Sequence, residues 1–225
     1  MLRKRGTVLG AVMILAAGLS AYDVPEHKQE TVLSDWRGQE QPYLAFPALL
    51  DLGDDILVSY KRGKAHAADP GAFLEMLRLD GSSGAVKECK NIAALDGQIM
   101  QMGEWARFAN GDIANYIDAQ KKGQPSRIGL RVVRSSDNGK TFGPVERVGV
   151  IDGVEYGYAF EAITRGQTTW MLVMTFTNLT GGVYSKTLQR PVAGSVDVVR
   201  TEDNGRSWKF VRSITSELGG VSINE

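Results

Sequence analysis

Side chains that could bind an anion and move a proton gather between residues 60 and 69. The stretch Tyr60–His66 reads YKRGKAH, and Asp69 follows it. A guanidinium such as that of Arg62 can bind a carboxylate, His66 can carry a proton near neutral pH, and an Asp can act as an acid or base. The same residues also fit a solvated basic loop, with Asp69 as a turn residue beside Pro70-Gly71. We therefore expect either an anion-binding group or an ordinary surface loop.

Carboxylates and an aromatic residue form a second group of candidates. Glu104 and Glu161 each begin a predicted strand, Tyr158 lies in an aromatic stretch before the second of these strands, and Glu225 is the last residue of the sequence. Carboxylates at strand starts could serve acid–base chemistry, and an aromatic face could line a sugar site. Such residues also occur as ordinary surface or packing residues.

The elements that must position these side chains are β-hairpins. The stretches 47–60, 104–116 and 161–176 each contain a strand, a turn with Gly, and a second strand with alternating polar and apolar residues. Asn110-Gly111 is a typical hairpin turn. Because no convincing helical period interrupts these runs, we expect an all-β protein built from units of about 55 to 60 residues.

Two nearly identical turns follow the second and third hairpins. Val132–Phe142 reads VVRSSDNGKTF and Val198–Trp208 reads VVRTEDNGRSW. Hydroxyl and carboxylate side chains can accept hydrogen bonds from turn N–H groups, and Asn-Gly tolerates positive φ. The residues expected to build these turns are Ser135, Asp137, Gly139, Thr141 and Phe142 in the first copy, and Thr201, Asp203, Gly205, Ser207 and Trp208 in the second. Their aspartates are therefore expected to be structural rather than catalytic. The stretch 73–88 fits a degenerate third copy.

The repeated pattern is similar to the Asp-box, or bacterial neuraminidase repeat, and the chain resembles the sialidase superfamily of β-propellers. The resemblance implies blades of four antiparallel strands, six blades in a complete propeller, and Asp-boxes on the rim away from the catalytic face. It predicts about three blades here, at about 43–100, 101–155 and 156–218, with a fourth beginning at 219–225. The chain is accordingly expected to represent the N-terminal half of a propeller.

The same resemblance implies an exo-α-sialidase-like glycoside hydrolase that acts on acidic glycans. In that family three arginines clamp the sugar carboxylate, an Asp is the acid/base, and a Tyr–Glu pair supplies the nucleophile. By position, Asp69 matches the acid/base Asp and Glu225 the Glu of that pair. The residues expected to bind substrate are Arg62, His66, Glu104, Glu161 and Tyr158.

One position departs from the family pattern. Ala45, within Leu44–Pro47, stands where the first arginine is expected. Two alternatives therefore remain open. One is a non-catalytic Asp-box propeller that binds glycan or protein, and the other is a different carbohydrate-active enzyme that uses Arg62, His66 and Asp69.

Composition excludes several other classes of protein. Lys+Arg and Asp+Glu are both 26, and no basic stripe appears, so nucleic acid is not an expected partner. The two histidines show no zinc spacing and there is no Gly-rich phosphate loop, so neither a metal nor another cofactor is expected. The expected partner is a sialylated or other acidic glycan.

The N-terminal segment 1–21 resembles a secretory signal peptide. Basic residues 3–5 precede a short apolar run at 7–19, and small residues follow at Ser20 and Ala21. We expect a secreted or periplasmic protein with no stable membrane insertion after cleavage, while an uncleaved N-terminal anchor is the alternative. The domain that remains is 22–225.

Overall fold

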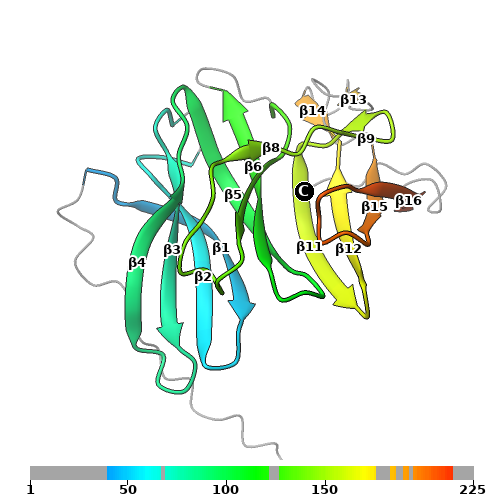
Figure 1. Cartoon of the computed structure of the whole chain (residues 1–225). Helices are drawn as coiled ribbons and strands as arrows, with labels where there is room; N and C mark the ends of the chain where they lie inside the picture. The colour runs from blue at the N-terminus through cyan, green and yellow to red at the C-terminus, as the bar shows by residue number, and fades with distance from the viewer. Residues whose placement is uncertain are drawn as a thin grey trace, which may run out of the picture. The chain divides into compact units, whose positions relative to one another are not determined.

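Where the structure describes the chain, its named secondary-structure elements are β-strands (Figure 1). The computed structural model describes residues 40–66, 69–121, 127–175, 183–185, 190–192 and 195–214. Within these ranges every named element is a strand, and no helix has the length and hydropathy needed to cross a membrane. The predicted all-β class is confirmed.

Three antiparallel sheets of four strands follow one another along the chain. The first sheet contains β1 (Tyr43–Asp51), β2 (Asp55–Gly63), β3 (Phe73–Asp80) and β4 (Val86–Ala93). The second contains β5 (Gln98–Arg107), β6 (Ile113–Lys121), β7 (Arg131–Ser135) and β8 (Glu146–Arg147). The third contains β11 (Tyr158–Arg165), β12 (Thr168–Met174), β15 (Val196–Thr201) and β16 (Lys209–Ser213). Two short pairs complete the elements, β9 (Val150–Ile151) with β10 (Val154–Glu155) and β13 (Val183–Ser185) with β14 (Arg190–Val192). In each four-stranded sheet the spatial order of the strands follows the chain, which is the arrangement of a propeller blade.

The cores lie between successive sheets, so the second sheet is covered on both faces. β6 is buried at every residue except its last, whereas β11 alternates between more and less exposed positions. Side chains that pack between the first and second sheets include Leu57, Met76, Met100, Trp105, Ile113 and Val133. Side chains that pack between the second and third sheets include Phe108, Tyr116, Met171, Val173, Val199 and Trp208. The first strands also meet, because β5 contacts both β1 and β11. Face-to-face sheets with their first strands together confirm the propeller type of fold.

A capped turn joins the third and fourth strands of the second sheet. The Ser135 hydroxyl accepts a hydrogen bond from the N–H of Gly139 at 2.8 Å, and Asp137 Oδ1 accepts one from the N–H of Thr141 at 2.9 Å. Hydrogen bonds from Ser135 and Thr141 hold the pKa of Asp137 well below its usual range. The third sheet has an equivalent capped turn. There the Thr201 hydroxyl accepts a hydrogen bond from the N–H of Gly205 at 3.0 Å, and Oδ1 of Asp203 accepts one from the N–H of Ser207 at 2.9 Å. Both aspartates are therefore employed in holding turns.

An arginine on the third strand of one sheet reaches the capped turn of the next sheet. Arg78 Nη2 donates to the carbonyl of Asn138 at 2.8 Å, and Arg134 Nη2 donates to the carbonyl of Gly205 at 2.6 Å. We call these two bonds the intersheet arginine contacts. The turn glycine packs closely there as well, because a Cβ on Gly139 would lie 2.8 Å from Leu57 Cδ1.

Candidate functional site

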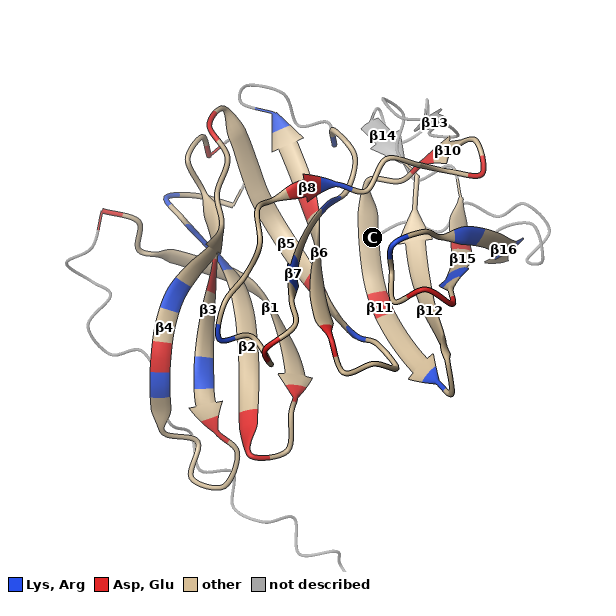
Figure 2. Cartoon of the chain, in the orientation of Figure 1, with Lys and Arg blue, Asp and Glu red and all other residues tan. Residues whose placement is uncertain are grey.

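The candidate site lies where the first strand of each sheet begins and the second strand ends. Strand pairing places Tyr43 beside Gly63, Gln98 beside Lys121, and Tyr158 beside Met174. Because the strands are antiparallel, the capped turns are at the other end of the sheets. Charged residues occur on several strands and loops around this end (Figure 2). We call the group formed by Tyr43, Lys61, His66, Asp69, Gln101, Asp118, Arg127 and Tyr158 the strand-start cluster.

Lys61 is at the centre of the cluster and is fully buried. Its Nζ donates to the carbonyl of His66 at 2.9 Å and to Oε1 of Gln101 at 2.9 Å, and it lies 4.0 Å from Oδ2 of Asp69. Burial lowers the pKa of Lys61, while the charges of Asp69 and Asp118 oppose that effect. The ammonium group thus ties the loop after β2 to β5 of the next sheet.

Asp69 shapes the loop that carries His66. Its Oδ2 accepts hydrogen bonds from the N–H groups of Lys64 at 2.6 Å and Ala65 at 3.2 Å, and the residue is 4% exposed. Gly63 leaves space for this arrangement, since a side chain there would collide with the Asp69 carboxylate. One carboxylate oxygen of Asp69 is therefore already used to organise the loop.

The exposed ring of His66 contacts two half-buried aromatic residues of β1. The hydroxyl of Tyr43 lies 3.0 Å from Nδ1 of His66, and the ring of Phe46 is centred 5.3 Å from the imidazole. Phe46 has a positive φ of 57° at the irregular register between Ala45 and Ala48. Positive φ is unusual for a bulky residue and is often associated with functional positions. The irregular strand thus brings an aromatic ring beside the histidine.

The other half of the cluster spans the second and third sheets. Arg127 Nε donates to Oδ2 of Asp118 at 3.1 Å, and Asp118 is 1% exposed. The Arg127 guanidinium also lies 5.7 Å from the centre of the Tyr158 ring, which is the geometry of a cation–π contact. The hydroxyl of Tyr158 donates to Sδ of Met102 at 3.1 Å, and its ring packs beside Phe160. Since the Asp118 charge acts on Lys61, the two halves form one electrostatic unit.

Arg62 is engaged differently from the sequence expectation. Successive residues of a strand point to opposite faces, so Arg62 faces away from Lys61. Arg62 Nε donates to Oε2 of Glu75 at 2.7 Å, and the hydroxyl of Tyr60 donates to the same oxygen at 2.5 Å. Burial and the hydrogen bond to Glu75 raise the pKa of Tyr60 far above its usual value. The expected pairing of Arg62 with His66 in one anion-binding group is therefore replaced by a buried ion pair on the other face of the sheet.

The two glutamates that the sequence placed at strand starts lie inside strands. β5 begins at Gln98 and β11 at Tyr158, so Glu104 pairs with Tyr116, well along the sheet. Burial raises the pKa of Glu104 to about 7; a hydrogen bond from the N–H of Trp105 opposes the shift, and the charge of Glu161 adds to it. A carboxyl group that titrates near neutral pH is suited to donate a proton.

Several members of the cluster were not among the sequence candidates. These residues are Tyr43, Lys61, Gln101, Asp118 and Arg127. A signal for Asp118 was present, because it is the one charged residue in the strand segment IANYIDA, whose other residues are uncharged, and a buried charge must be paired. Lys61 is the cross-strand partner of Ala45, so a cation lies next to the position where the resemblance to sialidases predicts an arginine. Glu225 and segment 1–21 lie outside the described residues.

A metal centre is not formed by the described part of the chain. Within those ranges no three His, Cys, Asp or Glu side chains are arranged to hold a metal ion.

Solved structures show to which proteins this fold is similar. A protein of unknown function from Dyadobacter fermentans matches 76% of the chain with a TM-score of 0.57 and 15% identity, and the match covers 54% of that protein. The Hadza microbial sialidase Hz136 matches 77% with a TM-score of 0.57 and 12% identity, covering 38% of its own length. Trypanosoma rangeli sialidase, in its covalent complex with 2,3-difluorosialic acid, matches 76% with a TM-score of 0.53 and 11% identity, covering 31% of its length.

These similarities concern the fold. The chain spans about half or less of each of these proteins. No protein-family model matches the sequence, and no curated protein sequence matches it. The chain therefore has a fold similar to that of sialidases, at low sequence identity.

Proposed function

We infer that the chain supplies part of a sialidase-like glycoside hydrolase site that acts on acidic glycans. The observation that supports this proposal most directly is the strand-start cluster, in which buried charges and half-buried aromatic rings from three successive sheets meet at one end, beside the exposed His66. Sugar sites combine apolar or aromatic faces with a few fixed polar groups. His66 with Tyr43 and Phe46 offers such a face, and Arg127 over Tyr158 offers another.

The proposal assigns proton transfer to carboxyl groups of the inner strands and loops. Glu104 is the described carboxyl whose surroundings place its pKa at about 7. Asp69 is the position-matched acid/base of the family, and its contact with Lys61 places it within the cluster. Glu225, the position-matched partner of the nucleophile, remains part of the proposal on sequence grounds alone. His66 is exposed, and the hydroxyl of Tyr43 lies within hydrogen-bond distance of its ring.

A second candidate function is glycan or protein binding without catalysis. The observations that favour it are Ala45 at the position of the first arginine, and the commitment of both neighbouring cations to protein partners. Lys61 is held by Gln101 and the His66 carbonyl, while Arg62 is held by Glu75. A site that lacks an uncommitted arginine clamp could still bind sugars through aromatic faces and hydrogen bonds.

Turnover and binding assays on the same chain separate the two functions. A fluorogenic α-sialoside is the substrate, and calorimetry with sialyllactose measures binding. Glu104→Gln should lower turnover at least about 100-fold if Glu104 is the general acid, because such groups typically contribute 10²–10⁴-fold. Glu202→Gln, an exposed change at the capped-turn end, is the matched control and should retain activity.

The turnover and binding results together show which of the two functions the chain has. Turnover that is sensitive to Glu104→Gln supports the hydrolase, and binding of sialyllactose without turnover supports the non-catalytic function. Failure of the folded chain both to turn over the sialoside and to bind sialyllactose would overturn the assignment to acidic glycans.

A further inference from the structure

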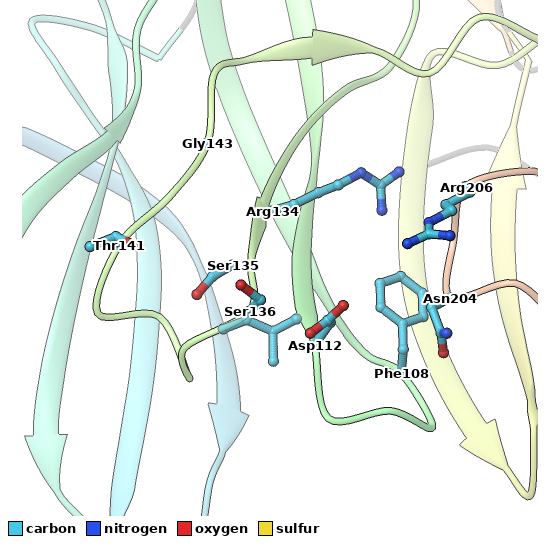
Figure 3. A pocket seen from close by; sticks show the side chains of 10 residues that line it. Phe108, Asp112, Arg134, Ser135, Ser136, Thr141, Gly143, Asn204 and Arg206 are labelled. Carbon is cyan, nitrogen blue, oxygen red and sulfur yellow. The ribbon is translucent and has the colours of Figure 1, made fainter.

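A cavity of about 320 Å³ lies between the second and third sheets, beside their capped turns. It is at the opposite end of the sheets from the strand-start cluster. Its lining includes Phe108, Asp112, Arg134, Ser136, Asn204 and Arg206. Figure 3 shows the guanidinium groups of Arg134 and Arg206 turned toward each other, with Phe108 beside them. Two cationic groups therefore face one hollow.

The intersheet arginine contact between the first and second sheets provides an internal reference. There, Arg78 is neutralised by two carboxylates, Asp55 Oδ2 at 2.7 Å and Glu88 Oε2 at 3.6 Å. The Arg78 side chain is 9% exposed. Its charge is thus satisfied by the protein itself.

The equivalent contact between the second and third sheets lacks this compensation. Arg134 has an ion pair with Glu146 at a longer distance of 3.9 Å, and the Glu146 side chain is 56% exposed. Asp112 precedes β6 as Asp55 begins β2, but its Oδ2 accepts a hydrogen bond from Asn110 at 2.7 Å within its own turn. The carboxylate that would neutralise Arg134 by analogy is therefore turned to another donor.

Arg206 adds a second positive charge to the same hollow. It follows Gly205 in the capped turn of the third sheet, and its guanidinium has no hydrogen bond or ion pair with any residue that the structure describes. The turn itself is held by other side chains, chiefly Thr201 and Asp203. The turn therefore fixes the backbone of Arg206, while the charge of its exposed side chain remains available.

We propose that this cavity is a binding site for an oxyanion, namely a sulfate, phosphate or carboxylate group, held between Arg134 and Arg206. Planar guanidinium groups match the oxygen geometry of such anions and can bind them through paired hydrogen bonds. The amide of Asn204 and the hydroxyl of Ser136 supply further polar contacts on the lining. A volume of about 320 Å³ is at the small end of the range for ligand sites, which suits a single charged group rather than a long oligosaccharide.

The site would take this anion from one of two sources. A free inorganic anion and an anionic substituent of a glycan present the same oxygen atoms to the arginines. The site is independent of the proposed hydrolase activity, because it uses none of the residues of the strand-start cluster.

Direct binding measurements on the whole chain test the proposal. Calorimetry at low ionic strength would use sodium sulfate, sodium phosphate and a sulfated disaccharide, with the unsulfated disaccharide as the control ligand. Arg206→Gln should raise the dissociation constant about tenfold, which corresponds to the loss of one charge-assisted hydrogen bond in a solvated site. Lys140→Gln changes the matching position of the other capped turn and should alter it less than about twofold. Asp112→Asn removes a negative charge from the lining and should tighten binding.

Each outcome decides between the alternatives. Binding of the inorganic anions with the expected ranking of variants supports a small-anion site, and binding of the sulfated disaccharide alone supports a glycan substituent as the source. Equal weakening by Arg206→Gln and Lys140→Gln would mean diffuse surface attraction and would overturn the site. Absence of binding by all three anionic ligands would overturn it too. Unchanged unfolding temperatures of the ligand-free variants exclude a folding defect as the cause.

Discussion

Gly205 has two reasons to be glycine, and substitution can separate them. Its φ is 76°, in the left-handed region, where a side chain costs about 1–2 kcal/mol. A Cβ there would also collide with the Phe108 ring and lie 2.7 Å from the hydroxyl of Tyr116 on the preceding sheet. Overpacking of a tight core costs a further ~1–3 kcal/mol. We therefore expect Gly205→Ala to destabilise the fold by about 2–5 kcal/mol.

Gly166 is the matched control. It also has a positive φ, 59°, but a Cβ on it would have no neighbour within 4 Å. Gly166→Ala should therefore cost only the backbone part, about 1–2 kcal/mol. The difference between the two variants isolates the packing of the turn on the neighbouring sheet, because both variants share the backbone cost.

Urea unfolding followed by tryptophan fluorescence measures both free energies. In a chain of this size each kcal/mol lowers the unfolding temperature by about 2–4 °C, so a thermal scan gives a second reading. Phe108→Leu should make space for the new methyl group, so Gly205→Ala should cost less in that background than in the wild type. The reasoning fails if Gly205→Ala and Gly166→Ala destabilise equally, or if Phe108→Leu brings no relief.

Two further predictions concern acidic residues within the sheets. Glu104→Gln should stabilise the fold by about 1–2 kcal/mol near pH 8 and have little effect near pH 4. The gain is smaller than the pKa shift alone would give, because water still reaches the carboxyl group and screens its charge. The sign follows from the raised pKa, since the favourable contribution of Glu104 to stability is complete below pH 4.5 and is lost as the pH rises through about 7. Urea unfolding of the wild type and of Glu104→Gln at both pH values measures the effect of the substitution on the free energy of unfolding. An equal effect at the two pH values would argue against the raised pKa. Glu75→Gln should destabilise by about 3–5 kcal/mol, because it leaves the buried Arg62 without its carboxylate, whereas the double change with Arg62→Met should recover part of the loss. Thermal unfolding of Glu75→Gln and of the double variant tests this coupling, and a Glu75→Gln variant as stable as the double variant would contradict it.

The sequence could predict the fold because the decisive interactions are local. The hydrogen bonds that the N–H groups of Gly139 and Thr141 donate to Ser135 and Asp137 join residues four positions apart. The residue types therefore define the capped turn directly. Hairpins such as the one at Asn110-Gly111 are local in the same way. Stacking of successive hairpins then leaves few alternatives to a propeller.

The site was harder to predict, because it depends on which face each residue takes. Lys61 and Arg62 are adjacent basic residues, and strand register decides that Lys61 enters the strand-start cluster while Arg62 pairs with Glu75. A one-residue change of register would exchange them. The irregularity between Ala45 and Ala48, which brings Phe46 beside His66, has no clear sequence signal. Contacts between different sheets, such as Arg127 over Tyr158, also require the assembled fold.

The intersheet arginine contacts make the second sheet a self-complementary unit. The second sheet carries a donor, Arg134 on β7, and an acceptor, the Asn138 carbonyl in its own turn. A duplicated copy of such a unit would bring both halves of the next junction with it, and no compensating substitution would be needed on either side. A chain built this way can lengthen by copying a single coding segment. An arginine at the position of Arg78 or Arg134 can then change in evolution only together with the capped turn of the next sheet.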